Sequence, residues 1–388
     1  MSHSPYFITL KPKGAFYFGS EQNFAGGENY FALSRQFPQQ STLLGVLRYK
    51  LLEANNMLAR DHGRKLDKAA IDHIGPQSFI HESLELNHNF GAISHLSALS
   101  IFDGKNFFFP GHRDSGFKGN GKKEDHFQLD IKSSTPNLKG YDIKTWYPPF
   151  VIGEGGKPIE LTSIFKSKTQ VGIYRTTARY PSDRKIDEDE EKGFYKKTSW
   201  VFQNRDWAFC FFAWINRTAG DKLIEFTSGN GNLTPVGGEH SLFAMEVKEA
   251  EHLSQQWVDQ AAKAHTMPSA FHRAILLSDT YANPEDLYKL SHFAMAQPTP
   301  FRFMATSVEE TENYFAIENP GGKTFKYLKK SMLFQLIQAG SVFYIKDDKV
   351  DEFKKAMVPY KAYHQIGNNE FMIHHPDNSI YYEPYKAK

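Results

Sequence analysis

Short apolar runs, rich in aromatic residues and separated by turn signals, constrain the fold of this chain more than any other feature. Residues 6–10, 207–215, 242–247, 273–277 and 340–345 have patterns that predict strands. Helical patterns are few and do not alternate regularly with these strands, which argues against a doubly wound parallel sheet. Repeats of fixed period are absent from the sequence, so solenoids and propellers are excluded. We therefore predict an α+β fold built on antiparallel sheets.

The composition narrows the class of protein further. Of 388 residues, 40% are hydrophobic, and 46 basic residues face 44 acidic ones, so the chain is not of the disordered class. The net charge of +2 neither demands nor excludes nucleic acid. The length favours two domains, and a polar helical stretch followed by Met267-Pro268 places the division at residues 1–250 and 251–388.

The single cysteine and the apolar runs bear on the compartment. Cys210 has no partner for an internal disulfide, and it lies in an aromatic run that predicts an inert core thiol. The longest strongly apolar run, residues 207–215, is far shorter than a membrane span, and no signal peptide is readable at the start. We expect a cytoplasmic protein without membrane contact.

Two segments interrupt the regular pattern. Residues 111–140 hold five glycines and few apolar positions, which predicts a mobile insertion loop. Residues 164–202 have two strand patterns separated by the acidic run at 187–191, which predicts a projecting hairpin with a solvated tip. A shorter hairpin is predicted at Asp103-Gly104, a two-residue turn signal.

The sequence offers no convincing catalytic constellation. Its sixteen histidines form no HExxH or paired HxxxH motif, and the GxSxG and Walker A patterns are missing. His374 and His375 precede a proline and are predicted to lie in a solvated late turn. We therefore expect neither metal nor cofactor, and we expect that the protein is not an enzyme.

One segment combines the groups that bind single-stranded RNA, which are cations for phosphates, aromatic rings for stacking and amides for base edges. Residues 35–48 lead from a loop into a predicted helix with Ser41 or Thr42 as its N-cap, running to about Leu58. The free amides and dipole of a helix start favour a phosphate, and Arg48 follows within two turns. A capped amphipathic helix with an exposed arginine is an equally weighted interpretation.

The hairpin and two glycine turns are further candidates. Residues 165–197 hold nine lysines or arginines interleaved with tyrosines, although a solvated charged hairpin explains the same pattern. The turns at residues 236–240 and 363–368 contain glycines that could bring backbone amides close to a phosphate.

Seven segments, taken in their order along the chain, form a further pattern: residues 26–29, 37–48, 103–110, 170–175, 191–195, 236–239 and 339–344. In this order the segments resemble the RAMP-superfamily subunit of type III-B (Cmr) CRISPR effector complexes that binds the 5′ handle of the guide RNA. Two departures concern His240-Ser241, where that family often has a basic residue, and residues 365–369, where it usually has a Gly-aromatic-Gly loop.

The resemblance implies a noncatalytic protein of antiviral defence with two ferredoxin-like (RRM-like) modules, the first carrying the insertion and the hairpin as a thumb. It would grip the crRNA 5′ handle, pair with the large polymerase/cyclase-like subunit, and cap the backbone of RAMP subunits. Its thumb would meet target RNA. The residues expected at RNA are Arg35, Gln36, Gln39, Ser41, Thr42 and Arg48 for the handle, Lys168, Tyr174, Arg175 and Arg179 in the thumb, and Gly237 and Gly238.

Two alternatives stay open at this point. One is a guide-processing endoribonuclease of the same superfamily that uses a histidine as general acid or base, with His112 or His364 near residues 35–48. The other is a purely structural assembly subunit that touches no RNA, which would be insensitive to removal of charge from the hairpin.

Overall fold

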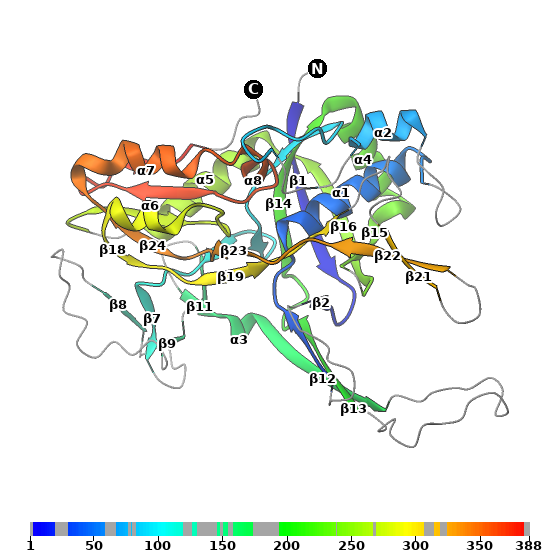
Figure 1. Ribbon diagram of the computed structural model, residues 1–388, viewed down its shortest axis with the longest axis horizontal. Helices are drawn as coiled ribbons and strands as arrows, with labels where there is room; N and C mark the ends of the chain where they lie inside the picture. Colours follow the sequence, from blue (N-terminus) through cyan, green and yellow to red (C-terminus); the bar gives the residue numbers. More distant parts are fainter. Residues whose placement is uncertain are drawn as a thin grey trace.

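The computed structural model has a mixed α+β architecture with several antiparallel sheets, as the strand patterns predicted (Figure 1). Among the paired strands, β3 and β13 run parallel. The model describes residues 3–19, 30–58, 67–76, 79, 83–118, 126–129, 146–147, 150–153, 158–173, 194–237, 239–266, 269–305, 314–318 and 324–383.

The largest sheet has nine strands. β14 (Ala208–Asn216) and β1 (His3–Pro12) form its centre, and their antiparallel register runs from His3 opposite Asn216 to Leu10 opposite Phe209. β4 (Ile93–Leu96) also pairs with β14. The rest of the sheet follows the order β11 (Pro158–Glu160), β10 (Phe150–Ile152), β6 (Phe107–Pro110), β5 (Ser100–Phe102), β14, β1, β16 (Ser241–Glu249), β15 (Leu233–Val236).

Helices cover both faces of this sheet, which explains why β14 is apolar at nearly every position. Phe209 and Phe211 pack in the cluster that contains α1 (Gln40–Ala54) and α4 (Arg217–Ser228). The alternate residue Phe212 packs in the opposite cluster, against Trp257 of α5 (Glu251–His265). Cys210 is fully buried, and burial raises the pKa of its thiol, so the prediction of a core cysteine is confirmed.

The second sheet is smaller and lies beside the first (Figure 1). Its helices, α6 (Pro284–Lys289) and α7 (Val350–Met357), bury Leu287, Phe353 and Met357 against it. The strand order is β18 (Ser291–Met295), β24 (Val342–Ile345), β17 (His272–Leu276), β25 (Phe371–His374), β26 (Ile380–Tyr381).

The predicted hairpin at 164–202 is present as β12 (Phe165–Ile173) and β13 (Phe194–Phe202), which project from the body (Figure 1). Its base is tied to the body through β3 (Tyr30–Arg35) and through a bridge between Phe16 and Trp200. The acidic run at 187–191 lies outside the described residues. So do Tyr174, Arg175 and Arg179.

Short elements complete the fold. They are β2 (Phe18–Gly19), α2 (Lys68–Ile74), β7 (Ser115–Lys118), β8 (His126–Gln128), β9 (Trp146–Tyr147), α3 (Leu161–Ile164), the 3-10 turns Asn230–Asn232 and Asp347–Lys349, β19 (Pro298–Phe301), β20 (Met304–Ala305), β21 (Tyr314–Glu318), β22 (Thr324–Lys330), β23 (Phe334–Ile337) and α8 (Lys361–Gln365). Within the described part of the chain, no helix is long and apolar enough to cross a membrane.

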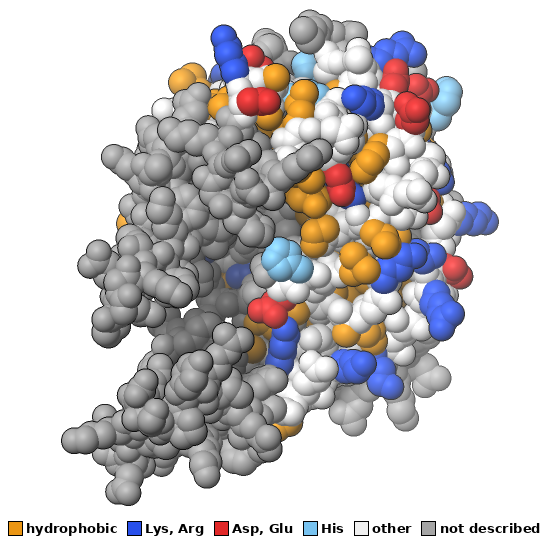
Figure 2. All heavy atoms as spheres, turned by 90° about the vertical axis from the view of Figure 1, so that its right-hand side faces the viewer, with side chains coloured by type: hydrophobic (Ala, Val, Ile, Leu, Met, Phe, Trp, Pro, Cys, Tyr) orange, Lys and Arg blue, Asp and Glu red, His pale blue; other side chains and the backbone are white. Residues whose placement is uncertain are grey.

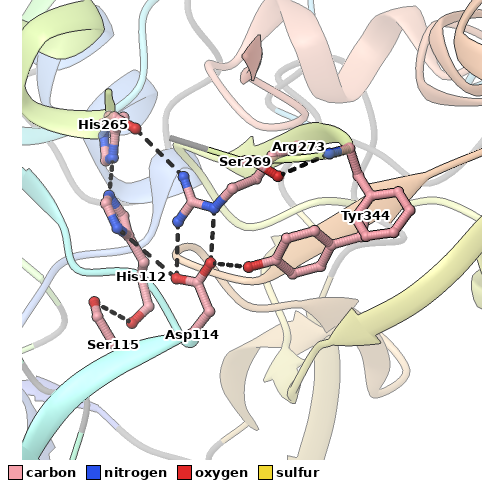
Figure 3. A network of polar contacts seen from close by, with 8 residues as sticks. His112, Asp114, Ser115, His265, Ser269, Arg273 and Tyr344 are labelled. Carbon is pink, nitrogen blue, oxygen red and sulfur yellow. Dashed lines mark hydrogen bonds and ion pairs between the residues drawn. The ribbon is translucent and has the colours of Figure 1, made fainter. Parts of the chain in front are cut away.

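The prediction of a mobile loop at 111–140 is wrong for its first residues. Asp114 is fully buried and accepts two hydrogen bonds from Arg273 on β17, at 2.7 and 2.8 Å, and a third from the Tyr344 hydroxyl at 2.6 Å (Figure 3). His112 is also buried and contacts His265 of α5, with 2.5 Å between ring nitrogens. These buried contacts attach the start of the insertion to the second sheet through Asp114 and to α5 through His112. The low content of apolar residues in the insertion did not indicate them.

Three local predictions also need correction. The turn between β5 and β6 spans residues 103–106, because the Asp103 carboxylate accepts from the amides of Lys105 and Asn106 and closes a four-residue loop. His374 lies in β25 and is buried, so it is not part of a solvated turn. Helix α1 begins at Gln40 and ends at Ala54, before Leu58.

The packing of α5 bears on the predicted division at residue 250. Trp257 of this helix is buried against Phe109 and Phe212 of the nine-stranded sheet. The segment that follows the predicted boundary therefore shares a hydrophobic cluster with the first sheet.

Candidate nucleic-acid interface

A cavity of about 830 Å³ opens where the segment before α1 meets the second half of the chain. Its walls come from the ends of β3, β6 and β17, from the strand pair β19–β23, and from the base of the hairpin. The polar and aromatic side chains of its lining, together with Ala339, include Arg35, Gln36, Phe37, Gln39, Gln40, Arg113, Trp200, Asp279, Gln338 and Asn368.

The first wall holds Arg35, Gln36 and Gln39, all predicted from the sequence. Arg35 donates from Nη2 to the Pro300 carbonyl at 2.6 Å. In the amide orientation that satisfies both of its groups, Gln39 donates to the Arg302 carbonyl at 2.7 Å and accepts from Arg35 Nη1 at 3.3 Å. Because these bonds fix the guanidinium at the cavity wall, its positive charge has a defined position.

The start of α1 adjoins this wall. Gln39 occupies the N-cap position, its side chain makes no capping hydrogen bond, and the first turn contains no acidic residue. Ser41 and Thr42, predicted as caps, instead lie within the first turn and are half-buried. A helix start without a side-chain cap favours an anion, because the helix dipole and the first amides point toward it.

The opposite wall contains a second arginine that the sequence analysis did not single out. Arg113 donates from Nη2 to Gln338 Oε1 at 2.6 Å, and its backbone amide donates to the Gly340 carbonyl at 2.9 Å. Gly340 has a φ of +82°, and a Cβ there would lie 2.1 Å from the Gly111 carbonyl oxygen. Only glycine permits this close approach of the two backbones. The Ala339-Gly340 pair was a readable signal, whereas its partner segment was not.

Asp279 gives the cavity one acidic group. Its Oδ1 accepts from the Ala339 amide at 2.9 Å. Burial raises the pKa of its carboxyl, while the Ala339 amide and the charge of Arg35 act in the opposite direction. Among the described residues that line the cavity, two arginines therefore face one aspartate, which leaves an excess of positive charge.

Two aromatic rings, Phe37 and Trp200, line the cavity and are only half-buried. Phe37 packs edge-on against Phe165, at 5.5 Å between ring centroids, and the Trp200 indole donates to the Ser34 carbonyl at 2.9 Å. Rings held in this way can stack on a planar group without large loss of side-chain freedom.

Arg48, which was predicted to contact RNA, lies away from the cavity. It is 7% exposed and donates to the carbonyls of Ile74 and Gly75 at 3.0 and 2.9 Å, and burial lowers the pKa of its guanidinium to about 10. It does not line the cavity. Arg48 therefore joins α1 to the end of α2, and we leave it out of the binding surface proposed below.

The remaining predicted residues do not meet at the cavity. Lys168 is exposed, and the β12–β13 register puts it on the face opposite to Trp200. Gly237, with a φ of +76°, lies in the turn between β15 and β16, next to the Tyr17 carbonyl. Gly238 lies outside the described residues.

The turn at residues 363–368 is internal. The side chain of Gln365 donates to the carbonyls of His88 and Ser94 at 2.8 and 2.9 Å. The amides of Gly367 and Asn368 donate to the carbonyls of His364 and Tyr363. These backbone groups are therefore used within the fold and are not presented to a phosphate.

The histidines considered for catalysis are buried. His112 is 3% exposed, and His364 is 7% exposed with a ring nitrogen 2.8 Å from the Met357 carbonyl. Burial lowers the pKa of His364, which disfavours its charged form. Within the described ranges, no group of three or more potential metal ligands occurs.

Comparison with known proteins yields structures alone, since no family model and no curated protein matches the chain. A chain of the cryo-EM structure of the Type III-B Cmr-beta bound to cognate target RNA aligns with 94% of this chain and 96% of its own length, at 16% identity and a TM-score of 0.45. A chain of the same assembly bound to cognate target RNA and AMPPnP, state 1, covers the same shares at 15% identity and a TM-score of 0.41.

Proposed function

We propose that this protein is a noncatalytic RNA-binding subunit of a type III-B CRISPR effector complex, and that it holds the 5′ handle of the crRNA in the cavity before α1. The observation that carries the proposal is the set of groups in that cavity: two fixed arginines, a helix start without a side-chain cap, and two half-buried aromatic rings. Single-stranded RNA needs this combination of phosphate, stacking and amide contacts.

The strand orders support the expected ferredoxin-like modules. In the first sheet the core order is β16–β1–β14–β5, with α1 after β1 and α4 after β14. In the second sheet the order is β25–β17–β24–β18, with α6 after β17 and α7 after β24. Both follow the β-α-β-β-α-β arrangement, in which the first strand lies between the third and the fourth.

The proposed partners follow from the resemblance of the sequence to the Cmr subunit described above. They are the crRNA, the large polymerase/cyclase-like subunit and the backbone RAMP subunit, with target RNA met through the thumb. Co-purification of the chain from its native cells, followed by sequencing of the bound RNA, tests this assignment. We expect RNAs that share a 5′ tag derived from the repeat, and RNA without a common 5′ end would contradict the assignment.

The cavity itself is tested by removing its two cations. Arg35→Gln and Arg113→Gln should each weaken binding of a fluorescent single-stranded RNA. Each should also reduce the slope of log affinity against log salt by about 0.7 for every phosphate contact that is lost. Anisotropy titrations at several salt concentrations measure both quantities.

The matched control is Lys355→Gln, which removes an exposed cation of α7 that does not line the cavity. It should leave affinity and salt slope unchanged. Equal salt slopes for the control and the two arginine variants would show that RNA does not bind in this cavity.

A further inference from the structure

Two buried amide side chains line the cavity without a full set of hydrogen bonds. Gln40 is 7% exposed and Asn368 is 2% exposed, and both belong to the cavity lining. Gln40 Oε1 and Asn368 Nδ2 have no hydrogen-bond partner in the protein. Buried polar atoms are nearly always paired, so each exception needs an explanation.

The position of Gln40 is set by its other amide atom. Its Nε2 donates to the Ser97 carbonyl at 2.8 Å, which fixes the orientation of the amide and leaves Oε1 as an acceptor. Gly367 has a φ of +86°, and a Cβ there would lie 2.1 Å from Gln40 Nε2. The glycine thus allows the Gln40 amide to lie against the turn that carries Asn368.

Asn368 differs sharply from its neighbour in the sequence. Asn369 is fully buried, accepts from the Tyr281 amide at 2.7 Å, and donates to the carbonyls of Tyr281 and Met357 at 2.8 and 3.3 Å. The Asn368 side chain, by contrast, has a buried Nδ2 donor without a partner in the protein. The Asn369 side chain therefore joins its turn to Tyr281 and Met357. The Asn368 Nδ2 atom makes no comparable hydrogen bond within the fold.

We propose that Gln40 and Asn368 form a base-reading subsite, in which one unpaired nucleobase of the bound RNA donates an N–H to Gln40 Oε1 and pairs with the Asn368 amide. This inference rests on the proposed function and specifies how the cavity selects its RNA. The Watson–Crick edge of every base presents a donor beside an acceptor, which is the complement of these two amides. The order of donor and acceptor along that edge differs between bases, so a pair held in one orientation selects among them. Both atoms are buried although their side chains line the cavity, so contact with a base requires the lining around them to open.

The cavity also contains groups that can contact the ring of a base and its phosphate. Phe37 and Trp200 line the same cavity, and the Arg35 guanidinium is fixed at its wall. A nucleotide seated with its base toward Gln40 would therefore have aromatic and cationic groups within the same space. The cavity volume of about 830 Å³ lies in the range of pockets that enclose a ligand of this size.

The decisive variant is Asn368→Leu, tested for thermal stability and for binding of a randomised single-stranded RNA octanucleotide pool. Leucine has nearly the same volume and removes a buried polar group that has no partner, so the melting temperature should stay equal or rise. RNA affinity should fall about five- to tenfold because one hydrogen bond to the base is lost. Asn369→Leu is the control, and it should lower the melting temperature because it loses three hydrogen bonds and places a leucine at a φ of +60°.

Sequencing of the RNA retained from the pool gives an independent readout that does not depend on a variant. Wild-type protein should enrich one base at one position, and Asn368→Leu should remove that preference while other positions stay unchanged. A pool without positional preference would overturn the subsite, as would unchanged affinity of Asn368→Leu or a melting temperature as low as that of Asn369→Leu. Failure of the wild-type protein to bind the pool at all would instead contradict the proposed function.

Discussion

Arg35 and Arg48 are cations of the same segment, but their surroundings give them different roles. Arg35 is half-buried at the cavity wall, whereas Arg48 is enclosed and bonded to two backbone carbonyls. The sequence pattern could not separate them, because the carbonyls that receive Arg48 belong to residues 74 and 75, at the end of α2. Its role depends on how α2 packs against α1.

We expect Arg48→Ala to destabilise the fold and to leave RNA binding unchanged. The two bonds to Ile74 and Gly75 are charge-assisted, so their loss should lower the free energy of unfolding by about 3 kcal/mol. Urea unfolding measures this change, and RNA titration at two salt concentrations measures binding. A reduced salt slope in a variant of unchanged stability would return Arg48 to the RNA interface.

Buried histidines make stability depend on pH. Burial, reinforced by nearby charges, lowers the pKa of both His95 and His374 to about 3. In the unfolded chain their pKa is about 6.5, so between these values the unfolded state binds more protons. The contribution of each neutral histidine to the free energy of unfolding should therefore be fully present above pH 6.5. It should fall as the pH drops below this value, by up to about 1.4 kcal/mol per pH unit for each histidine.

Chemical unfolding at pH 7.5, 6 and 5 tests this expectation. At each pH, the free energy of unfolding of the wild type is compared with that of His374→Gln. The variant should show a shallower dependence, because one titrating group is removed. His252, which lies on α5, provides the control substitution. An identical slope for wild type and His374→Gln would contradict the assignment of His374 as a neutral buried group.

At the level of elements, the segment before β7 is joined to the second sheet by a buried ion pair. Arg273 and Asp114 are both 0% exposed, and Tyr344 of β24 adds its hydroxyl to the same carboxylate (Figure 3). Removing one partner leaves a buried charge without compensation. We expect Asp114→Ala to lower the unfolding free energy by about 3–5 kcal/mol.

The double variant Asp114→Ala with Arg273→Met separates pairing from packing. Because it removes both charges, it should recover a large part of the stability that Asp114→Ala loses, and a double-mutant cycle in urea measures the coupling. If the double variant is no more stable than the single one, the pair acts through packing rather than charge.

Exposed apolar side chains mark another element, the edge pair β15–β16. Leu233 and Leu242 are 45% and 47% exposed, and they lie on one side of the pair, because Leu242 is opposite Pro235 and Leu233 is opposite Ala244.

Figure 2 shows the right-hand side of the molecule of Figure 1, where apolar side chains lie near the middle of the face and lysines and arginines lie beside and below them. Lysines and arginines therefore gather on part of this face, although the chain as a whole is nearly neutral.

At the level of the whole molecule, the cavity is built from segments that are far apart in the sequence. Residues 34–40 meet residues 110–113, 277–279, 297–301 and 336–339. Each segment comes from the end of a strand or a turn, where backbone and side chains are free to face a ligand. The cavity therefore exists only when the strand pair β19–β23 lies beside the start of α1, as Figure 1 shows.

The sequence alone determined the α+β class, the central strands, the projecting hairpin, the core cysteine and the first wall of the cavity, because these depend on local periodicity and on neighbouring residues. Tertiary structure decided the opposite wall of the cavity and brought Asn368 into its lining. Arg113 and Asp279 carry no local signal, and the turn that ends at Asn368 was predicted only as a source of backbone amides. Their places in the cavity lining depend on segments that are distant in the sequence. Packing likewise decided that Arg48 is enclosed while Arg35 faces the cavity, because burial is a property of the assembled sheets and helices.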